Sequence, residues 1–233
     1  MKAKGIAKCF IDFGMIILLL FLMPFEMVGR RNHGWLGMAM FSLFIVHHVL
    51  NRKWLLNLNK GRYSVIRILQ TVITLLAFLS MLGSMVSAVL LIHEIFDFIP
   101  FQGNTAFARS LHMLSAYWGF IFMGLHLGFH WNMVMGMMRK ATGNKAASSF
   151  KIWSSRAAVF VVSSFGIYAF INNNIINYLF LRSHFVFFDM QKSLASFLAD
   201  YVAMMVLWVC VGYYSMKAIQ KYSGKRLKKI YNG

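Results

Sequence analysis

The sequence predicts an all-α integral membrane protein, a helical bundle with about six transmembrane helices. Hydrophobic residues make up 59% of its 233 residues, and the mean hydropathy is +0.62. Only 13% of the residues are charged, which is about half the fraction found in soluble domains. The apolar residues also gather into stretches close to the roughly 20 residues that a helix needs to span a bilayer.

Six apolar stretches follow one another along the chain, and each is expected to form one membrane-spanning helix. The first follows a short basic segment, as in a signal peptide, but it lacks a small-residue cleavage site and is expected to be retained. Three asparagines, Asn172, Asn173 and Asn174, interrupt the fifth, and an interfacial or re-entrant segment is expected at 175–188. The stretches cover residues 10–28, 33–51, 68–92, 110–138, 157–171 and 194–216.

Lys and Arg residues lie mainly on one side of this predicted bundle. Of the 24, 19 precede the first helix, follow the sixth, or lie in the second-to-third and fourth-to-fifth connections. Cytoplasmic loops are rich in Lys and Arg, so both termini are expected to be cytoplasmic. The helices at 33–51 and 110–138 would then be parallel, each running from outside to inside.

The net charge of +18 is explained by this topology. The charge is confined to short loops beside apolar helices, where it attracts anionic lipid headgroups. Membrane lipids are therefore the expected partners of the basic segments, and nucleic acid is not.

Four histidines form two pairs with identical spacing. His33 and His47 are 14 residues apart, and so are His112 and His126. Fourteen residues return an α-helix to within about 40° of the same face, with a rise of about 21 Å. On parallel helices His33 would face His112, and His47 would face His126. This arrangement predicts two b-type haems, each bound by two histidines. The binding would be non-covalent, because the chain has no C-x-x-C-H motif.

The inner pair has a competing candidate. His130 lies 18 residues after His112, almost in phase with it, and could bind the metal in place of His126. The equal spacing on the two helices favours His126. His48 is rotated by a full 100° step from His47 and is the weaker candidate. The other two histidines are interpreted as residues near the membrane surface: His93 and His184.

The two helices are related by an offset of 79 residues, which also aligns Arg30 with Arg109. An Arg three residues before a helical His lies on the same face, and Arg pairs well with carboxylates such as haem propionates. Both arginines could equally be interfacial anchors. Four glycines would leave room for a macrocycle, although close helix packing explains them at least as well: Gly34, Gly37, Gly119 and Gly124.

The H-x13-H pattern on two helices resembles that of respiratory cytochrome b, although this chain is far shorter and lacks the P-E-W-Y quinol-site motif. A more specific resemblance lies in FARSLHMLSAYWGFIFMGLHLGFHW at 107–131 and HHVLNRKW at 47–54. These segments are similar to flavinylation-associated cytochromes, a family of small bacterial inner-membrane proteins. The resemblance covers about residues 10–140. It implies a four-helix dihaem core at 1–140. The apolar pattern predicts two more transmembrane helices at 141–233, with an interfacial segment at 172–190, and the resemblance does not extend to them.

The resemblance implies a function in which electrons cross the bacterial cytoplasmic membrane toward extracytoplasmic proteins that carry covalent FMN. The chain has no S/T-G-A-S/T flavin-attachment motif, so it would be the conduit within an oxidoreductase system. A quinone, a flavoprotein or a ferredoxin is a possible donor. Two other functions stay open: a transporter or channel with histidine proton relays, and a di-iron oxygenase that uses His47, His48, His126 and His130.

Overall fold

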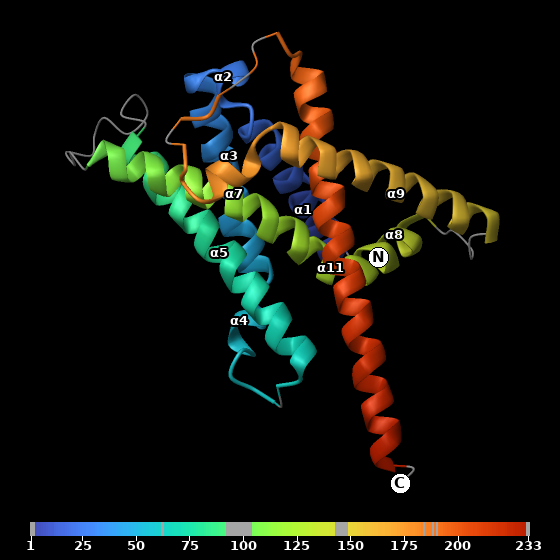
Figure 1. The fold of residues 1–233 in the computed structure, drawn as a ribbon. Helices are drawn as coiled ribbons and strands as arrows, with labels where there is room; N and C mark the ends of the chain where they lie inside the picture. The colour runs from blue at the N-terminus through green and yellow to red at the C-terminus, as the bar shows by residue number, and fades with distance from the viewer. Residues whose placement is uncertain are drawn as a thin grey trace.

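The computed structural model describes residues 3–61, 63–91, 104–142, 149–183, 185–187, 189 and 191–231. Within these ranges every regular element is a helix (Figure 1), which confirms the predicted all-α fold. The long helices are α1 (Ala3–Leu22), α3 (Arg30–Leu50), α5 (Val65–Leu91), α7 (Thr105–Phe129), α9 (Ser149–Asn172) and α11 (Leu194–Tyr231). The shorter ones are α2 (Phe25–Val28), α4 (Arg52–Leu56), α8 (Trp131–Thr142) and α10 (Ile175–Leu179).

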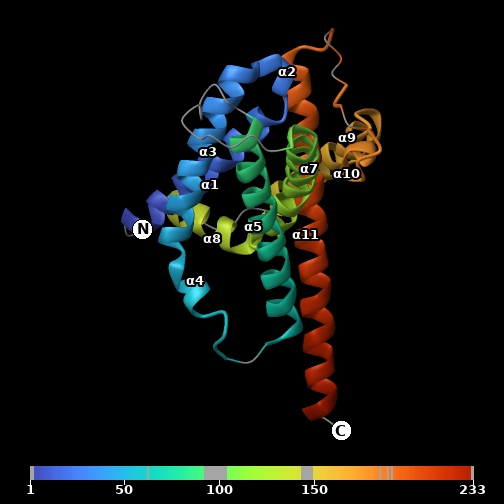
Figure 2. The same ribbon diagram turned by 90° about the vertical axis from the view of Figure 1, so that its left-hand side faces the viewer.

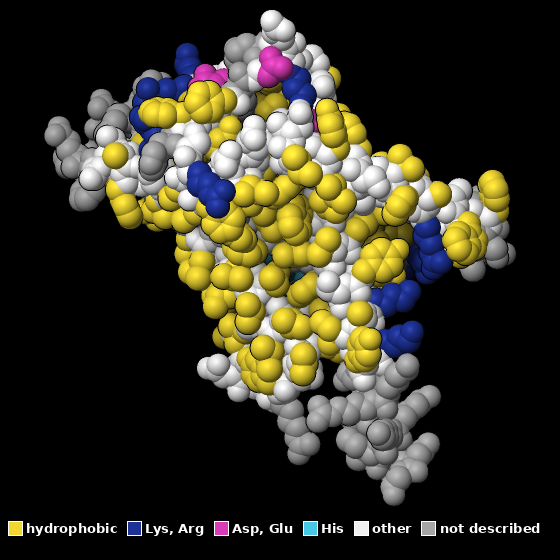
Figure 3. All heavy atoms as spheres, viewed as in Figure 1, with side chains coloured by type: hydrophobic (Ala, Val, Ile, Leu, Met, Phe, Trp, Pro, Cys, Tyr) yellow, Lys and Arg dark blue, Asp and Glu magenta, His cyan; other side chains and the backbone are white. Residues whose placement is uncertain are grey.

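Five of these helices are long and apolar enough to cross a membrane: α1, α3, α5, α9 and α11. Hydrophobic side chains cover the middle of the face seen in Figure 3. Large residues such as Phe10 and Phe160 are each 73% exposed, as expected for surfaces that contact lipid. The chain is therefore a multi-pass membrane protein.

Helix α7 is not among those five, although its 25 residues are enough to span a bilayer. It is the central helix of the bundle and packs against both α5 and α11. Several of its small and polar residues are buried, including Ser115, Tyr117 and Gly119. A helix enclosed by protein does not need an apolar surface all round, and this explains its lower hydropathy.

The long helices form two groups in the bundle. Helix α1 packs along α3, and α9 packs along α11. Figure 2 shows the α1–α3 pair beside the group that contains α5, α7 and α11. The two groups share one hydrophobic core, with members from Met15 in α1 to Val209 in α11. Helices from both sides of residue 140 therefore contribute to this core.

The first predicted helix, at 10–28, is wrong in its bounds. Helix α1 ends at Leu22, and Pro24, which has no backbone N–H to donate, precedes the single turn of α2. Gly29 then adopts φ 82° and ψ 149°, a conformation that favours glycine. This turn directs the chain into α3, so that His33 lies in the first turn of that helix.

The prediction of one helix over 110–138 is also wrong. Helix α7 ends at Phe129, His130 is its C-terminal cap, and α8 leaves in a new direction (Figure 1). Its exposed basic residues, Arg139 and Lys140, suit a helix that lies along the membrane surface. The break therefore separates His126, inside α7, from His130 at its end.

The predicted interruption after the fifth helix is confirmed. Asn174 has the left-handed φ of 53°, which asparagine tolerates better than most residues. Asn173 donates a hydrogen bond of 2.8 Å to Asp200 of α11, and Lys192 forms an ion pair with the same carboxylate. Asp200 is only 5% exposed, so these contacts keep a buried charge paired where the chain turns.

Close packing between α7 and α11 depends on glycines. A Cβ at Gly124 would lie 2.6 Å from the Cβ of Trp208. A Cβ at Gly128 would overlap the Val209 carbonyl oxygen and lie 2.9 Å from the Tyr213 backbone nitrogen. Backbone atoms cannot move aside as a flexible side chain can, so Gly128 sets the distance between the two helices.

We expect Gly128→Ala to destabilise the protein by about 1–3 kcal/mol, the usual cost of overpacking. Gly136→Ala is the matched control, because nothing lies within 4 Å of a Cβ at Gly136 in α8. Thermal unfolding in detergent measures both variants. Equal melting temperatures for the two variants would contradict the proposed role of Gly128.

Candidate functional site

The structure brings His33 and His112 together near the end of the bundle where α3 and α7 begin, which the basic loops predict to be the outer end. Their ring centres are 6.0 Å apart and their planes are inclined by 68°. Phe25 of α2 packs edge-on against His33, with ring centres 5.0 Å apart. Helices α3 and α7 thus present one histidine each to the same site, as the spacing predicts.

The imidazole of His112 is anchored by α5. Its Nδ1 lies 3.1 Å from the Ser84 carbonyl oxygen and 3.0 Å from the Ser87 hydroxyl. A carbonyl can only accept, so Nδ1 carries the hydrogen and Nε2 carries the lone pair. The Ser87 hydroxyl itself donates to the Gly83 carbonyl at 2.6 Å, which leaves its oxygen free to accept from His112.

His33 lacks such an anchor. Its Nδ1 is buried, and no hydrogen-bond partner for it exists in the described part of the chain. A buried nitrogen without a partner costs about 1–3 kcal/mol. A ligand that bonds to Nδ1 would offset that cost.

The outer pair is spaced so that the two histidines could hold one haem iron between them. An imidazole nitrogen lies about 2 Å from a bound metal, so two imidazoles on opposite sides of one iron have ring centres roughly 6 Å apart. The distance between His33 and His112 agrees with this value. Helices α3 and α7 are not among the closely packed helix pairs of the described residues. Gly37, one turn after His33, has nothing within 4 Å of a Cβ.

At the inner end, His126 is anchored by α5 in the same way as His112. Its Nδ1 lies 3.1 Å from the Thr74 hydroxyl, which donates its own hydrogen to the Gln70 carbonyl at 2.7 Å. The Thr74 oxygen therefore accepts from His126, and Nε2 of His126 keeps its lone pair. A Ser and a Thr, each bonded to the carbonyl four residues earlier, thus orient the two histidines of α7.

His47 is anchored by a carboxylate on α1. Its Nδ1 lies 2.7 Å from Oδ1 of Asp12. Its Nε2 is the acceptor nitrogen and lies 3.4 Å from the Asn51 amide nitrogen. Lys8 of α1 donates to Asn51 at 2.6 Å, so two polar contacts join α1 to the inner end of α3.

The inner end gathers more histidines than the outer end. The ring centres of His126 and His130 are 4.8 Å apart, and those of His47 and His48 are 5.2 Å apart. In the described ranges, no group of three or more His, Cys, Asp or Glu residues is arranged to hold one metal ion together.

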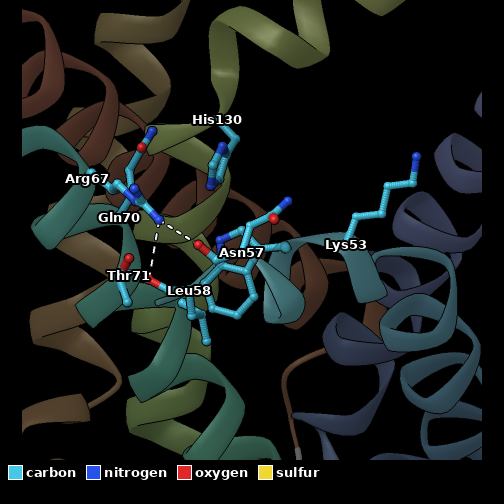
Figure 4. Close-up of a pocket in the computed structure, with 8 residues that line it drawn as sticks. Lys53, Asn57, Leu58, Arg67, Gln70, Thr71 and His130 are labelled. Atoms are coloured by element: carbon cyan, nitrogen blue, oxygen red, sulfur yellow. Dashed lines mark hydrogen bonds between the residues drawn. The ribbon is translucent and has the colours of Figure 1, made fainter. Parts of the chain in front are cut away.

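The alternative inner candidates differ from His47 and His126 in their surroundings. His130 lines an open pocket of about 380 Å³ at the inner surface, together with Trp54 and Arg67 (Figure 4). Arg67 donates to the carbonyl of Asn57 at 2.7 Å and closes the connection between α4 and α5. His48 bonds to the carbonyl one turn earlier in α3, at 2.8 Å.

The predicted cofactor-binding arginines have protein partners. Arg30 donates to the Leu91 carbonyl at the end of α5, at 3.1 Å. The Arg109 guanidinium lies 5.4 Å from the centre of the Phe185 ring. Both are exposed and stand one turn before the outer histidines, so the propionate and anchor interpretations both stay predictions.

The four predicted glycines divide into two groups. Gly119 and Gly124 face α5 and α11, close to Ser80 and Trp208, so the geometry assigns them to helix packing. Gly37 faces open space and Gly34 is buried in α3. Only these last two lie on the helix that faces α7 across the candidate site.

Sequence reasoning missed the residues that orient the histidines: Asp12, Thr74, Ser84 and Ser87. One signal existed for Asp12, because a lone carboxylate within an apolar helix indicates a functional residue. The hydroxyl residues gave none, because Ser and Thr are common in membrane helices. His93 and His184 lie outside the described residues.

No protein-family model matches this chain, and no curated protein or solved structure is significantly similar to it. The resemblance to flavinylation-associated cytochromes therefore stays a prediction. Function has to be inferred from the chain's own residues, chiefly from the two histidine sites and their anchors.

We expect Thr74→Val to destabilise the folded protein by about 1–3 kcal/mol, because the buried Nδ1–H of His126 loses its acceptor. Valine has nearly the same shape as threonine, so packing is kept. Thr71→Val, one turn earlier in the wall of the open inner pocket, is the control and should cost less than about 0.5 kcal/mol. Thermal unfolding in detergent compares the two, and equal losses would argue against the hydrogen bond.

Proposed function

We propose that the chain is a membrane-embedded b-type dihaem cytochrome that passes electrons across the bacterial cytoplasmic membrane. The observation that carries the proposal is the outer pair, His33 and His112, which face each other from different helices with ring centres 6.0 Å apart. Protein-held histidines from two helices are what axial ligation of a haem requires. The resemblance to flavinylation-associated cytochromes supports the same function.

His33 and His112 would hold the outer haem, and His47 and His126 the inner one. A bound haem supplies one-electron chemistry between its ferric and ferrous states. The α5 hydroxyls keep Nε2 of His112 and His126 available as metal ligands, as in other sites where outer hydrogen bonds fix the histidine tautomer. The 14-residue spacing separates the two sites by about 21 Å, a large part of the roughly 30 Å apolar core.

His126 is the better inner candidate than His130. Thr74 orients His126 inside α7, whereas His130 caps the helix and lines an open pocket. A ligand fixed by a hydrogen bond needs less reorganisation to bind a metal. His130 stays the alternate ligand.

The partners of this conduit would be redox proteins or quinones on its two faces. The resemblance implies an extracytoplasmic acceptor that carries FMN. A quinone, a flavoprotein or a ferredoxin would supply electrons from the inner side. Arg30 and Arg109 would pair with the propionates of the outer haem, and Gly34 and Gly37 would give the macrocycle room.

The hydrogen bonds of the histidines weigh against the proton-relay alternative. A relay through an imidazole needs both ring nitrogens to exchange protons. Nδ1–H of His112 and of His126 is bonded to oxygens in α5, and the two hydroxyls donate in turn to backbone carbonyls. A proton path through these two histidines would end there.

The purified protein should show a dithionite-reduced b-type spectrum, with two haems per chain in a pyridine haemochrome assay. His33→Ala and His112→Ala should each remove one haem, and His126→Ala should remove the other. His130→Ala is the control and should keep both. If His126→Ala keeps both haems and His130→Ala loses one, His130 is the ligand. A well-folded preparation without a Soret band would overturn the proposal.

A further inference from the structure

The four histidines of the two sites differ in what holds their Nδ1 atoms. Neutral oxygens of α5 hold His112 and His126. The Nδ1 atom of His33 has no hydrogen-bond partner among the described residues. His47 alone of the four contacts a carboxylate in the described chain, Asp12, at 2.7 Å.

Asp12 is placed to act on the inner site as a negative charge. Within the described residues, Asp12 forms an ion pair with His47. The neighbouring Lys8 donates a hydrogen bond to Asn51. The side chain of Asp12 is 43% exposed and that of His47 is 27% exposed.

A carboxylate on Nδ1 changes what the imidazole donates to a metal on Nε2. It draws the Nδ1 hydrogen toward itself and makes Nε2 a stronger electron donor. A stronger donor and a nearby negative charge both favour the oxidised, more positive state of the metal, which lowers its reduction potential. At the outer site, Arg30 and Arg109 stand one turn before the histidines, and positive charge has the opposite effect.

We propose that Asp12 is a positioning residue that gives the inner site the lower reduction potential of the two. This inference rests on the proposed function and deepens it by naming the residue that sets the order of the two reduction potentials. A reductant on the inner side, a quinol or a reduced flavin, is oxidised by one electron per transfer. An oxidised flavin on the outer side is reduced by that electron, and no bond of the chain's residues is formed or broken.

The order of the two potentials can be measured with one haem at a time. His33→Ala leaves the inner haem and His126→Ala leaves the outer one, and a spectroscopic redox titration of each variant gives its midpoint. The inner midpoint should be the lower of the two. An inner midpoint equal to or above the outer one would overturn the inference, whatever happens to any Asp12 variant.

Asp12→Asn then tests the residue itself, because its amide oxygen can still accept from His47 but carries no charge. In the His33→Ala background it should raise the remaining midpoint, and in the His126→Ala background it should leave the midpoint unchanged. Asp12→Glu should keep the low midpoint of the inner site. Glu26→Gln, which removes an exposed charge at the outer side, is the charge-matched control and should leave the inner midpoint unchanged.

The outcomes separate the inference from the function on which it rests. Failure to bind any haem would end the proposed function. Two bound haems with midpoints that Asp12→Asn does not change would leave the cytochrome in place and refute the role of Asp12. Loss of the inner haem in Asp12→Asn but not in Asp12→Glu would support the positioning role.

Discussion

The structure depends on one constraint, which is that an imidazole N–H inside a membrane bundle needs an acceptor. For His112 and His126 that acceptor comes from α5, through Ser84, Ser87 and Thr74. Because both histidines lie on one helix, these bonds fix the register of α5 against α7. They also determine which ring nitrogen keeps its lone pair. The same bonds that support the fold therefore prepare the chemistry of the site.

The central position of α7 follows from this arrangement. A helix that carries histidines, serines and glycines is poorly suited to lipid and is enclosed by α5 on one side and α11 on another. Gly124 and Gly128 allow α11 to approach closely enough to exclude lipid. The last helix of the chain thus encloses the helix that bears two candidate ligands. The core accordingly extends across the division expected near residue 140.

The features that sequence predicts well are local ones. Apolar length predicts the helices, and equal spacing predicts that His33 meets His112. The adjacent asparagines also predict the break in the helix at Asn173–Asn174. Asp12 meets His47 across 35 residues and Thr74 meets His126 across 52, and no periodicity links such positions. The glycines could not distinguish a cofactor site from helix packing, because a small residue is compatible with either neighbour. Gly128, whose backbone packs against α11, lies next to the last residue of α7.

The division of the bundle into an α1–α3 pair and a group around α7 has a consequence for biogenesis. The N-terminal pair is synthesised first and is joined by its own contacts, including those of Lys8 and Asp12 with the end of α3. Domains and subdomains that emerge early can fold before the rest of the chain exists. The second group follows later and brings His112 and His126 already oriented by α5. A cofactor bound between these two sets of helices would enter last, and its binding would complete assembly by joining them.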